Sequence, residues 1–399
     1  MPDHLRAAPR PSAPPAPPCK VVVIWIDWYA YHIARFRGLM AAPTLAGRVC
    51  GVELVGGVGV HTGLKFREDL PADLPIHTLM PHSSWAEAGQ RRLALKLWQH
   101  LSRTDPETVL VPGYYTLPAI AAALWARLHG RTSILMTEST AGDHTRTPWK
   151  EAAKSLLIRT LFHAAVTGGR AHRHYLQQLG FPASRVGRFY DVVDNASLAE
   201  RTHTLRKASP HHFGLPEIYF LYVGRLAEEK NIRGLLDAWI EYRYTGGTWP
   251  LVLVGDGPEA ASLRSLAAAS PFSQDVHFAG HKSSSDLPPF YAFAGCFVLP
   301  SRREPWGLVV NEAMAAGLPV IVSSLCGCAE DLVVENQNGY TFNPAHPTEL
   351  VSSLHQVAGA SPEFLTSMRT HSVAQVAPFT PANFGLEVAR LAQGCDTPP

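Results

Sequence analysis

The sequence of 399 residues is short of charge, of cysteine and of long apolar runs, and each shortage excludes a class of protein. Charged residues make up 17% and the formal net charge is +2, so the composition predicts no general affinity for nucleic acid. No apolar run reaches the length of a membrane-spanning helix, and the first residues lack the charged start and apolar core of a signal peptide. We therefore expect a cytoplasmic protein.

Metal and redox signatures are also missing. The 6 cysteines are scattered, and Cys326-x-Cys328 has neither a second pair nor the histidines that would complete a zinc site. We expect reduced thiols, which are usual in the cytoplasm. The sequence also has no Asp-x-Asp pair that would hold a divalent cation on a phosphate group.

What the sequence does contain is a regular alternation of apolar strands and helices, which predicts a parallel α/β fold. Aliphatic and β-branched runs predict buried strands at 21–26, 49–55, 109–111, 133–137, 166–169, 188–193, 219–223, 251–254, 276–280, 297–299 and 320–322. Helical patterns lie between them, and later ones cover 347–357, 362–376 and 381–393. Residues 1–19 form a proline- and alanine-rich tail that we expect to be disordered, and the polar segment 194–213 predicts a linker.

The stretch 298–322 carries the clearest chemical pattern. It predicts a strand, a loop with Glu304 and Gly307, a helix at 308–316 with Glu312 in it, and a stop at Gly317. A helix start leaves unpaired N–H groups that favour an anion. Carboxylates accept hydrogen bonds from hydroxyls instead. A ligand with phosphates in the middle and hydroxylated rings at both ends, such as a nucleotide sugar, fits this pattern.

The segment reads Pro-Ser-x-x-Glu-Pro-Trp-Gly-Leu-Val-Val-x-Glu-Ala-Met-Ala-x-Gly-Leu-Pro-Val, and it resembles the signature of the family 4 glycosyltransferases. The resemblance implies a retaining enzyme of the GT-B fold, with two Rossmann-like domains facing a central cleft. It also implies that Glu304 holds hydroxyls of the transferred sugar and that Glu312 binds the ribose. The backbone N–H groups of Gly307, Leu308 and Val309 would contact sugar and phosphates.

On this resemblance we expect an acceptor-side domain at 20–205 and a nucleotide-sugar-binding domain at 206–378. The last segment, 379–399, would place a helix back on the first domain. A second matching element is Gly224-Arg225 with Lys230, whose cations would neutralise the leaving diphosphate. Gly280, His281 and Lys282 would border the base, and Asp256 with its neighbouring glycine would shape the cleft near the phosphates.

The sequence departs from the family in its first half. Many members have a histidine where this chain has Glu138. Either Glu138 assists catalysis through its carboxylate, or Asp143 or His144 substitutes, or Glu138 only caps the next segment. The loop 27–32 after the first strand is aromatic instead of glycine-rich, which suits either acceptor contact or simple packing.

We therefore expect a metal-independent glycosyltransferase that moves a sugar from a UDP- or GDP-linked donor to a hydroxyl of unknown identity, with no cofactor. Two alternatives stay open: a nucleotide-sugar-binding subunit without activity, and a GT-B epimerase or phosphorylase. The basic amphipathic pattern at 91–101 suits packing on a core, with peripheral membrane contact as an alternative.

Overall fold

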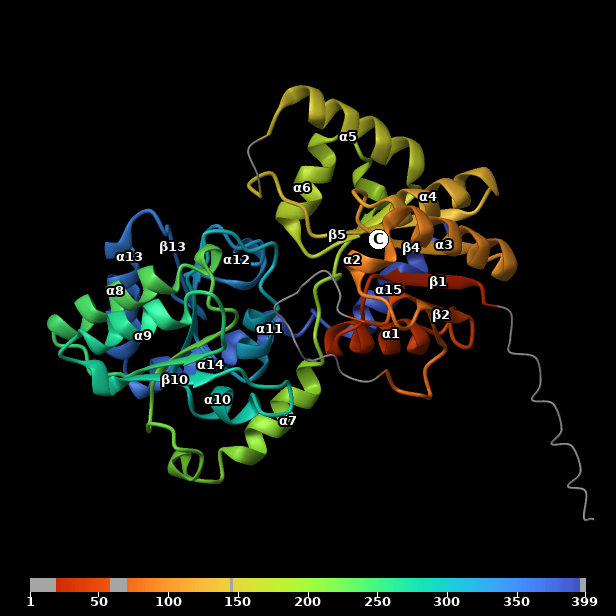
Figure 1. Ribbon diagram of the computed structural model, residues 1–399. Helices are drawn as coiled ribbons and strands as arrows, with labels where there is room; N and C mark the ends of the chain where they lie inside the picture. The colour runs from red at the N-terminus through yellow and green to blue at the C-terminus, as the bar shows by residue number, and fades with distance from the viewer. Residues whose placement is uncertain (1–18, 58–69, 144–145, 395–399) are drawn as a thin grey trace, which may run out of the picture.

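The computed structural model describes residues 19–57, 70–143 and 146–394, and in these the chain forms two parallel sheets (Figure 1). The first sheet has the strand order β3-β2-β1-β4-β5-β6-β7. Its strands are β1 (Val21–Trp25), β2 (Val49–Val55), β3 (Ile76–Met80), β4 (Thr108–Pro112), β5 (Thr132–Thr137), β6 (Ala164–Thr167) and β7 (Val186–Gly187). The proline- and alanine-rich tail lies outside the described residues, apart from Cys19.

The second sheet has the order β10-β9-β8-β11-β12-β13. Its strands are β8 (Phe220–Val223), β9 (Leu251–Val254), β10 (Val276–Gly280), β11 (Cys296–Leu299), β12 (Val320–Ser323) and β13 (Gly339–Phe342). In both sheets the order reverses beside the first strand, as in a doubly wound fold, and such a switch point is where ligands usually bind.

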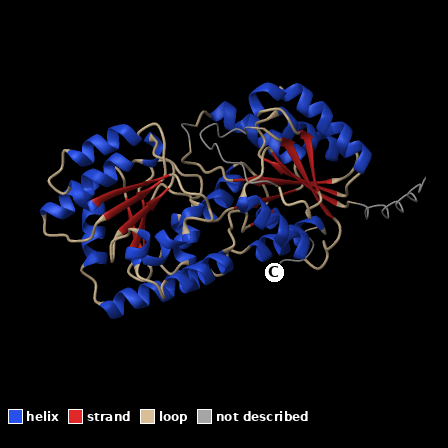
Figure 2. Cartoon of the chain, turned by 60° about the horizontal axis from the view of Figure 1, so that its bottom comes forward, coloured by secondary structure: helices blue, strands red, loops and turns tan. Residues whose placement is uncertain are grey.

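Helices cover both faces of each sheet, as Figure 2 shows. Those of the first half are α1 (Ala30–Ala41), α2 (Trp85–Ala88), α3 (Gln90–Thr104), α4 (Leu117–Leu128), α5 (Pro148–Leu161) and α6 (Arg170–Gln178). Those that follow are α7 (Asn195–Leu205), α8 (Ile232–Tyr244), α9 (Ala260–Ala268), α10 (Pro288–Phe293), α11 (Leu308–Ala315), α12 (Ala329–Leu332), α13 (Pro347–Ala358), α14 (Pro362–Val376) and α15 (Pro381–Ala392).

The two faces of the first sheet bury different side chains because neighbouring residues of a strand point to opposite faces. Val21, Val23 and Trp25 pack in the cluster that also contains residues of α1 and α15. Val22 and Ile24 pack with the buried residues of α3 and α4 on the other face. The apolar stripe of α3 is therefore used in the core.

The C-terminal helix lies on the first half of the chain, where Figure 1 shows it beside α1. The two helices approach closely at glycines. A Cβ added to Gly38 would lie 2.0 Å from the Pro381 carbonyl oxygen, and one added to Gly385 would lie 2.2 Å from the Gly38 oxygen. Any larger residue at either position would separate the helices.

Three expectations were wrong. Residues 188–193 do not form a strand, because the edge strand β7 already ends at Gly187. The segment expected to be a linker contains α7, which begins at Asn195 with Asp194 as its N-cap. Not all thiols are free, because a disulfide joins Cys19 to Cys50 on β2, with 5.9 Å between the Cα atoms. Sequence spacing could not show that pairing, which depends on β1 lying next to β2.

Candidate functional site

The loop between β11 and α11 places Glu304 and Gly307 at the start of α11. Gly307 has φ of 108°, a left-handed conformation that favours glycine, and an added Cβ would lie 2.9 Å from the Leu299 side chain. Among the described residues the structure gives no acceptor for the N–H groups of Leu308 and Val309. Both N–H groups, with the helix dipole behind them, are therefore available to an anion.

Glu304 pairs with Lys230 across two loops of the second sheet. Lys230 Nζ donates a hydrogen bond to Glu304 Oε2, and the hydroxyl of Ser301 donates to the same oxygen at 3.3 Å. Both charged side chains are only partly exposed, with side-chain exposures of 21% for Lys230 and 12% for Glu304. The pair places one cation and one carboxylate together close to the start of α11.

Arg225 lies apart from this pair. Its side chain is more than half exposed, and its guanidinium lies 3.6 Å from Glu229. Its backbone is held by the hydroxyl of Tyr222, which donates to the Arg225 carbonyl at 2.9 Å. The structure thus keeps Lys230 engaged with Glu304 and leaves the Arg225 guanidinium facing solvent.

The loops after β8, β9 and β10 touch one another through glycines. A Cβ on Gly255 would lie 1.9 Å from the Gly224 oxygen, and one on Gly257 would lie 2.3 Å from the Leu226 oxygen. The Gly255 N–H donates to the Gly280 carbonyl at 2.9 Å, which joins the third loop. Gly224, Asp256 and Gly280 are therefore brought together at the carboxyl ends of these strands.

Three further side chains of these loops, those of Asp256, His281 and Lys282, are at least partly exposed. Asp256 is exposed, and its Oδ1 accepts from the N–H of Gly257 in its own turn, at 2.8 Å. His281 is exposed, and the ammonium of Lys282 lies 5.8 Å from the ring centre of Phe290. These groups border the edge of the sheet without forming an ion pair with Glu304 or Lys230.

Glu312 lies about one turn into α11, and its carboxylate contacts α10. The hydroxyl of Tyr291 donates a hydrogen bond of 2.6 Å to its Oε2. Burial raises the pKa of Glu312, and the Tyr291 hydrogen bond opposes that rise. Within the part of the chain that the structure describes, Tyr291 is the one hydrogen-bond donor given for this carboxylate, so its other oxygen can accept from a hydroxyl.

Trp306 ties the Glu304 loop to the first half of the chain. Its indole is buried, and a Cβ on Gly168 or Gly169 would lie within 2.8 Å of the ring. Its Nε1–H donates to Asn311 Oδ1 at 2.8 Å. The two glycines after β6 are therefore explained by a close approach, since any side chain there would collide with the ring.

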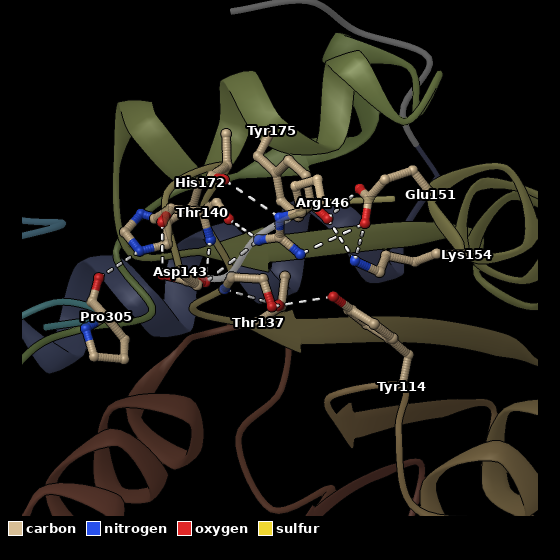
Figure 3. Close-up of polar contacts among 12 residues, drawn as sticks. Tyr114, Thr137, Thr140, Asp143, Arg146, Glu151, Lys154, His172, Tyr175 and Pro305 are labelled. Carbon is tan, nitrogen blue, oxygen red and sulfur yellow. Dashed lines mark hydrogen bonds and ion pairs between the residues drawn. The ribbon is translucent and has the colours of Figure 1, made fainter. Parts of the chain in front are cut away.

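His172 on α6 also holds this loop, because its Nε2 lies 2.9 Å from the Pro305 carbonyl oxygen (Figure 3). Its Nδ1 accepts from the Gly169 N–H at 3.3 Å, so the ring proton must be on Nε2, which then donates to Pro305. Burial lowers the pKa of His172, which keeps the ring neutral. No sequence pattern had singled out this histidine.

Asp331 on α12 makes the main ionic contact between the halves. Its carboxylate is fully buried and accepts from the Arg170 N–H at 2.7 Å and from the Arg188 guanidinium at 2.8 Å. The Arg170 guanidinium lies 3.4 Å away. Both arginines belong to the first half, so Asp331 fixes α12 to the start of α6 and to the end of β7.

Glu138 lies on the loop after β5, in the first half. Its side chain is partly buried, and it is one of the causes, after burial, that raise the pKa of the buried Asp191. Asp143 does not face it: both Asp143 oxygens accept from Thr140, each at 2.6 Å. His144 lies outside the described residues. Of the three first-half candidates, Glu138 is the one that the structure places beside a second carboxyl.

Arg146 holds the Glu138 loop against α5 and α6, as Figure 3 shows. Its guanidinium donates to the Thr140 and Ala141 carbonyls and lies 3.6 Å from Glu151. Glu151 in turn accepts from Lys154 at 2.8 Å and from the Tyr175 hydroxyl at 2.6 Å. These charges compensate one another, so the cluster holds the loop instead of offering a free cation.

The aromatic loop after β1, residues 27–32, is largely packed in the core of the first half. Trp28 is fully buried between Trp25 and Phe36, with ring centres 4.7 and 5.1 Å apart. The Tyr29 hydroxyl donates to Asp27 at 2.7 Å.

Two further features concern the described residues as a whole. No group of three or more histidine, cysteine, aspartate or glutamate side chains is placed there to hold a metal. None of the described helices is long and apolar enough to cross a membrane.

Comparison with known proteins adds to this geometry. Residues 206–364 match the model of the family described as Glycosyl transferases group 1. This region is therefore similar to glycosyl transferases group 1. The matched range begins after α7 and contains Arg225, Lys230, Glu304 and Glu312, so the similarity covers the loops described above.

Curated relatives of this region carry transferase or synthase names. The alpha-D-kanosaminyltransferase of Streptomyces kanamyceticus is 24% identical over 271 residues, which cover 68% of this chain and 69% of the relative. The glycogen synthase of Mycobacterium tuberculosis is 33% identical over 137 residues, 34% of this chain and 33% of the relative. The alpha-monoglucosyldiacylglycerol synthase of Acholeplasma laidlawii is 28% identical, over 41% of this chain and 40% of the relative. Beyond the first, these matches span less than half of each relative.

Solved structures match over nearly the whole chain. The Anabaena protein Alr3699/HepE in complex with UDP superimposes with a TM-score of 0.70 at 17% identity, covering 94% of this chain and 99% of that chain. The galactosyltransferase WaaB of the lipopolysaccharide outer core superimposes with a TM-score of 0.68 at 15% identity, covering 93% and 98%. The fold is therefore α/β of the GT-B type, with two Rossmann-like sheets.

Proposed function

We propose that this protein is a retaining glycosyltransferase that moves a sugar from a UDP- or GDP-linked donor to an acceptor hydroxyl. The observation that carries the proposal is the start of α11, where the unpaired N–H groups of Leu308 and Val309 follow the Glu304–Lys230 pair. The names of the relatives support a transferase, and UDP bound to the Anabaena neighbour supports a nucleotide donor.

The reaction needs no enzymic nucleophile in this scheme. The bond between the sugar C1 and the diphosphate oxygen breaks, and the acceptor oxygen bonds to C1 on the same face. The acceptor proton passes to an oxygen of the departing diphosphate. Arg225, Lys230 and the start of α11 supply positive charge where negative charge develops, and such stabilisation is usually the largest catalytic term. Closure of the two halves would exclude water.

The other residues take supporting roles in the proposal. Glu304 holds sugar hydroxyls, and the Gly307 backbone allows a close approach. Glu312 accepts from the ribose hydroxyls through the oxygen that Tyr291 leaves open. Gly280, His281 and Lys282 border the base, while Gly224 and Asp256 shape the edge near the phosphates. Glu138 faces the sugar from the first half.

The positive charge of Arg225, Lys230 and the helix start takes the part that a divalent cation has in other transferases, so we propose transfer without metal or cofactor. Turnover in buffer with excess EDTA tests this part separately. Undiminished turnover is expected, and a loss that added Mg²⁺ or Mn²⁺ restores would show that protein cations are not sufficient.

The central test is a donor screen. Thermal shift against several UDP- and GDP-sugars selects a donor, released nucleotide then measures transfer, and proton NMR of the product gives the anomeric configuration. Binding without release would favour the non-catalytic subunit, and inversion would refute the retaining reaction. The transferase and synthase names of the relatives do not favour an epimerase or phosphorylase.

We also propose that the solvent-exposed side of α3, α4 and α5 binds peripherally to an anionic membrane. These helices carry eight cationic residues and one acidic residue, in a chain whose formal net charge is only +2. Large apolar side chains are exposed among them, including Leu95, Leu128, Trp149 and Leu156. The Lys150 ammonium lies over the Trp149 ring, an arrangement that suits a membrane interface.

Sedimentation with vesicles tests the surface. We expect binding to vesicles with a third of phosphatidylglycerol and none to pure phosphatidylcholine at low salt, because the attraction is electrostatic. The variant Trp149→Ser with Lys150→Glu should lose binding, while Tyr244→Ser, which removes an exposed aromatic residue of the second half, should not. Equal binding by both variants would refute the surface.

A further inference from the structure

The first half of the chain contains a pocket of about 410 Å³ that shares no lining residue with the proposed donor site. Its walls come from α6, from the segments on both sides of β7 and from α15. Cavities that hold small organic ligands have volumes in this range. The size of the pocket therefore suits a whole small molecule instead of a single ion.

The charged side chains that line the pocket, within the described residues, are those of Arg173, Arg188, Glu387 and Arg390. Arg390 and Glu387 form an ion pair of 2.8 Å on α15. Because that pair neutralises itself, the charge that acts on a ligand comes mainly from the other two arginines. The electrostatics of the pocket therefore favour an anion.

Arg173 on α6 has little to bind in its present surroundings. Its Nη2 donates to the Ala183 carbonyl at 3.3 Å, and its buried Nε–H has no acceptor within the part of the chain that the structure describes. A guanidinium carries five N–H donors, and the one acceptor given for them here is uncharged. An anion in the pocket would supply the partner that this cation lacks.

Arg188, just after β7, is shared between the pocket and the second half. Its Nη2 donates to Asp331 at 2.8 Å, yet its side chain is 35% exposed. Asp331 also accepts from the backbone N–H of Arg170, at 2.7 Å. An anion in the pocket would therefore compete with Asp331 for Arg188 without leaving Asp331 unpaired.

Much of the remaining lining is apolar, with Phe189 and Leu386 as its largest members. Phe189 has φ of 67°, a left-handed conformation that is rare for a bulky residue and that occurs more often at ligand sites than elsewhere. Its ring centre lies 5.3 Å from the Arg188 guanidinium. The pocket thus places an aromatic ring beside a cation, which suits a ligand with both an apolar and an anionic part.

We propose that this pocket binds a small soluble organic phosphate. Arg173 and Arg188 hold the phosphate group, and Phe189 and Leu386 contact the apolar part. Two guanidinium groups from different segments suit the three terminal oxygens of a phosphate, whereas one guanidinium already satisfies both oxygens of a carboxylate. The site does not depend on the proposed glycosyl transfer.

Fluorine NMR of the full chain with 4-fluorophenyl phosphate as the probe tests the ligand class. We expect the probe to bind at least fivefold more tightly than 4-fluorobenzoate, and we expect 4-fluorophenol not to bind. Equal binding of the benzoate would refute the phosphate, and equal binding of the phenol would refute a cationic site. Inorganic phosphate should displace the probe only at higher concentration, because it lacks the ring, and displacement at equal concentration would refute the apolar contact.

The same experiment separates a soluble ligand from a lipid headgroup. Vesicles of phosphatidylcholine with phosphatidic acid present the same phosphate group on a surface. We expect them not to displace the probe, because the pocket is large enough to enclose a whole small molecule. Displacement by the vesicles would make the ligand a lipid and refute the soluble class.

Two variants and a matched control locate the probe. Arg173→Ala should weaken its binding about tenfold or more, because the change removes a charge-assisted hydrogen bond. Leu386→Glu, at a half-exposed position, should do the same by placing a carboxylate beside the phosphate. Arg185→Ala removes an equal charge from an exposed side chain outside the lining and should change the affinity less than about twofold. Equal effects of Arg173→Ala and Arg185→Ala would show only a general attraction to the surface and refute the site.

Two further variants test Arg188 and the location of the site. Asp331→Asn should tighten probe binding several-fold, because it removes the carboxylate that competes for Arg188; an unchanged affinity in the folded variant would overturn the role of Arg188. Arg225→Ala should bind the probe as the wild type does. Loss of binding in Arg225→Ala, together with normal binding in Arg173→Ala, would place the probe at the proposed donor site. That result would overturn the pocket and leave the proposed glycosyltransferase standing.

Discussion

Replacing Asp331 with alanine should destabilise the protein by about 2–4 kcal/mol, because the change removes a buried acceptor shared by two arginines. Hydrogen bonds to a charged group are worth roughly 1.5–3 kcal/mol each, and two of them, at 2.7 and 2.8 Å, end on this carboxylate. The Arg170 and Arg188 side chains are 50% and 35% exposed, so water replaces part of the loss.

Removing the buried carboxylate also removes the cost of its desolvation, which offsets part of the lost hydrogen-bond energy. The net loss is therefore about 2–4 kcal/mol instead of the roughly 3–6 kcal/mol of two full hydrogen bonds. Urea unfolding followed by circular dichroism measures the change. Glu330→Ala is the matched control: its carboxylate lies 3.8 Å from the same Arg170, but it is 48% exposed, so it should cost under about 0.5 kcal/mol. Equal losses in both variants, or a loss below about 1 kcal/mol for Asp331→Ala, would refute the reasoning.

Three further predictions concern the proposed donor site. Arg225→Ala and Lys230→Ala should each lower turnover by about a hundredfold, the usual cost of one donor to a developing anion, and wild-type rates in either would count against the assignment. Glu312→Gln should mainly raise the donor dissociation constant in calorimetry, with little change in Tm. Because burial raises the pKa of Glu312 and binding needs its ionised form, donor affinity should weaken as pH falls. Tyr291→Phe, which removes a hydrogen bond that lowers that pKa, should move the weakening to higher pH, whereas an unmoved curve would exclude Glu312 from binding.

Short buried apolar runs and helical stripes made much of the fold predictable. The strands at 49–55 and 251–254 and the helix at 117–128 have the bounds that the pattern indicated, because each is a continuous buried run or a full helical stripe. The edge strands β3 and β13 escaped notice, since β3 is partly exposed and β13, Gly-Tyr-Thr-Phe, is not a continuous apolar run. The residues 188–193 have a strand-like composition but no neighbouring strand to pair with.

The candidate site was predictable where it is local in sequence and not where it is formed by distant segments. Glu304, Gly307 and Glu312 fall within nine consecutive residues, so spacing alone indicated their elements. Arg35 and Asp191, a buried ion pair, are separated by 156 positions, and α1 contains both the buried Arg35 and the exposed Arg37, so the sequence did not show which arginine is buried. His172 gave no such hint.

The packing of the Trp306 indole against Gly168 and Gly169 bears on how the two halves can move relative to each other. An aromatic side chain of this kind buries roughly 150–250 Å², and at about 25 cal/mol per Å² its withdrawal from the Gly168–Gly169 turn would cost about 4–6 kcal/mol. A rotation of the two halves that keeps this ring packed therefore costs less free energy than one that exposes it to water. In such a rotation the loop that carries Glu304 moves little, and the parts of the two halves farthest from Trp306 move most.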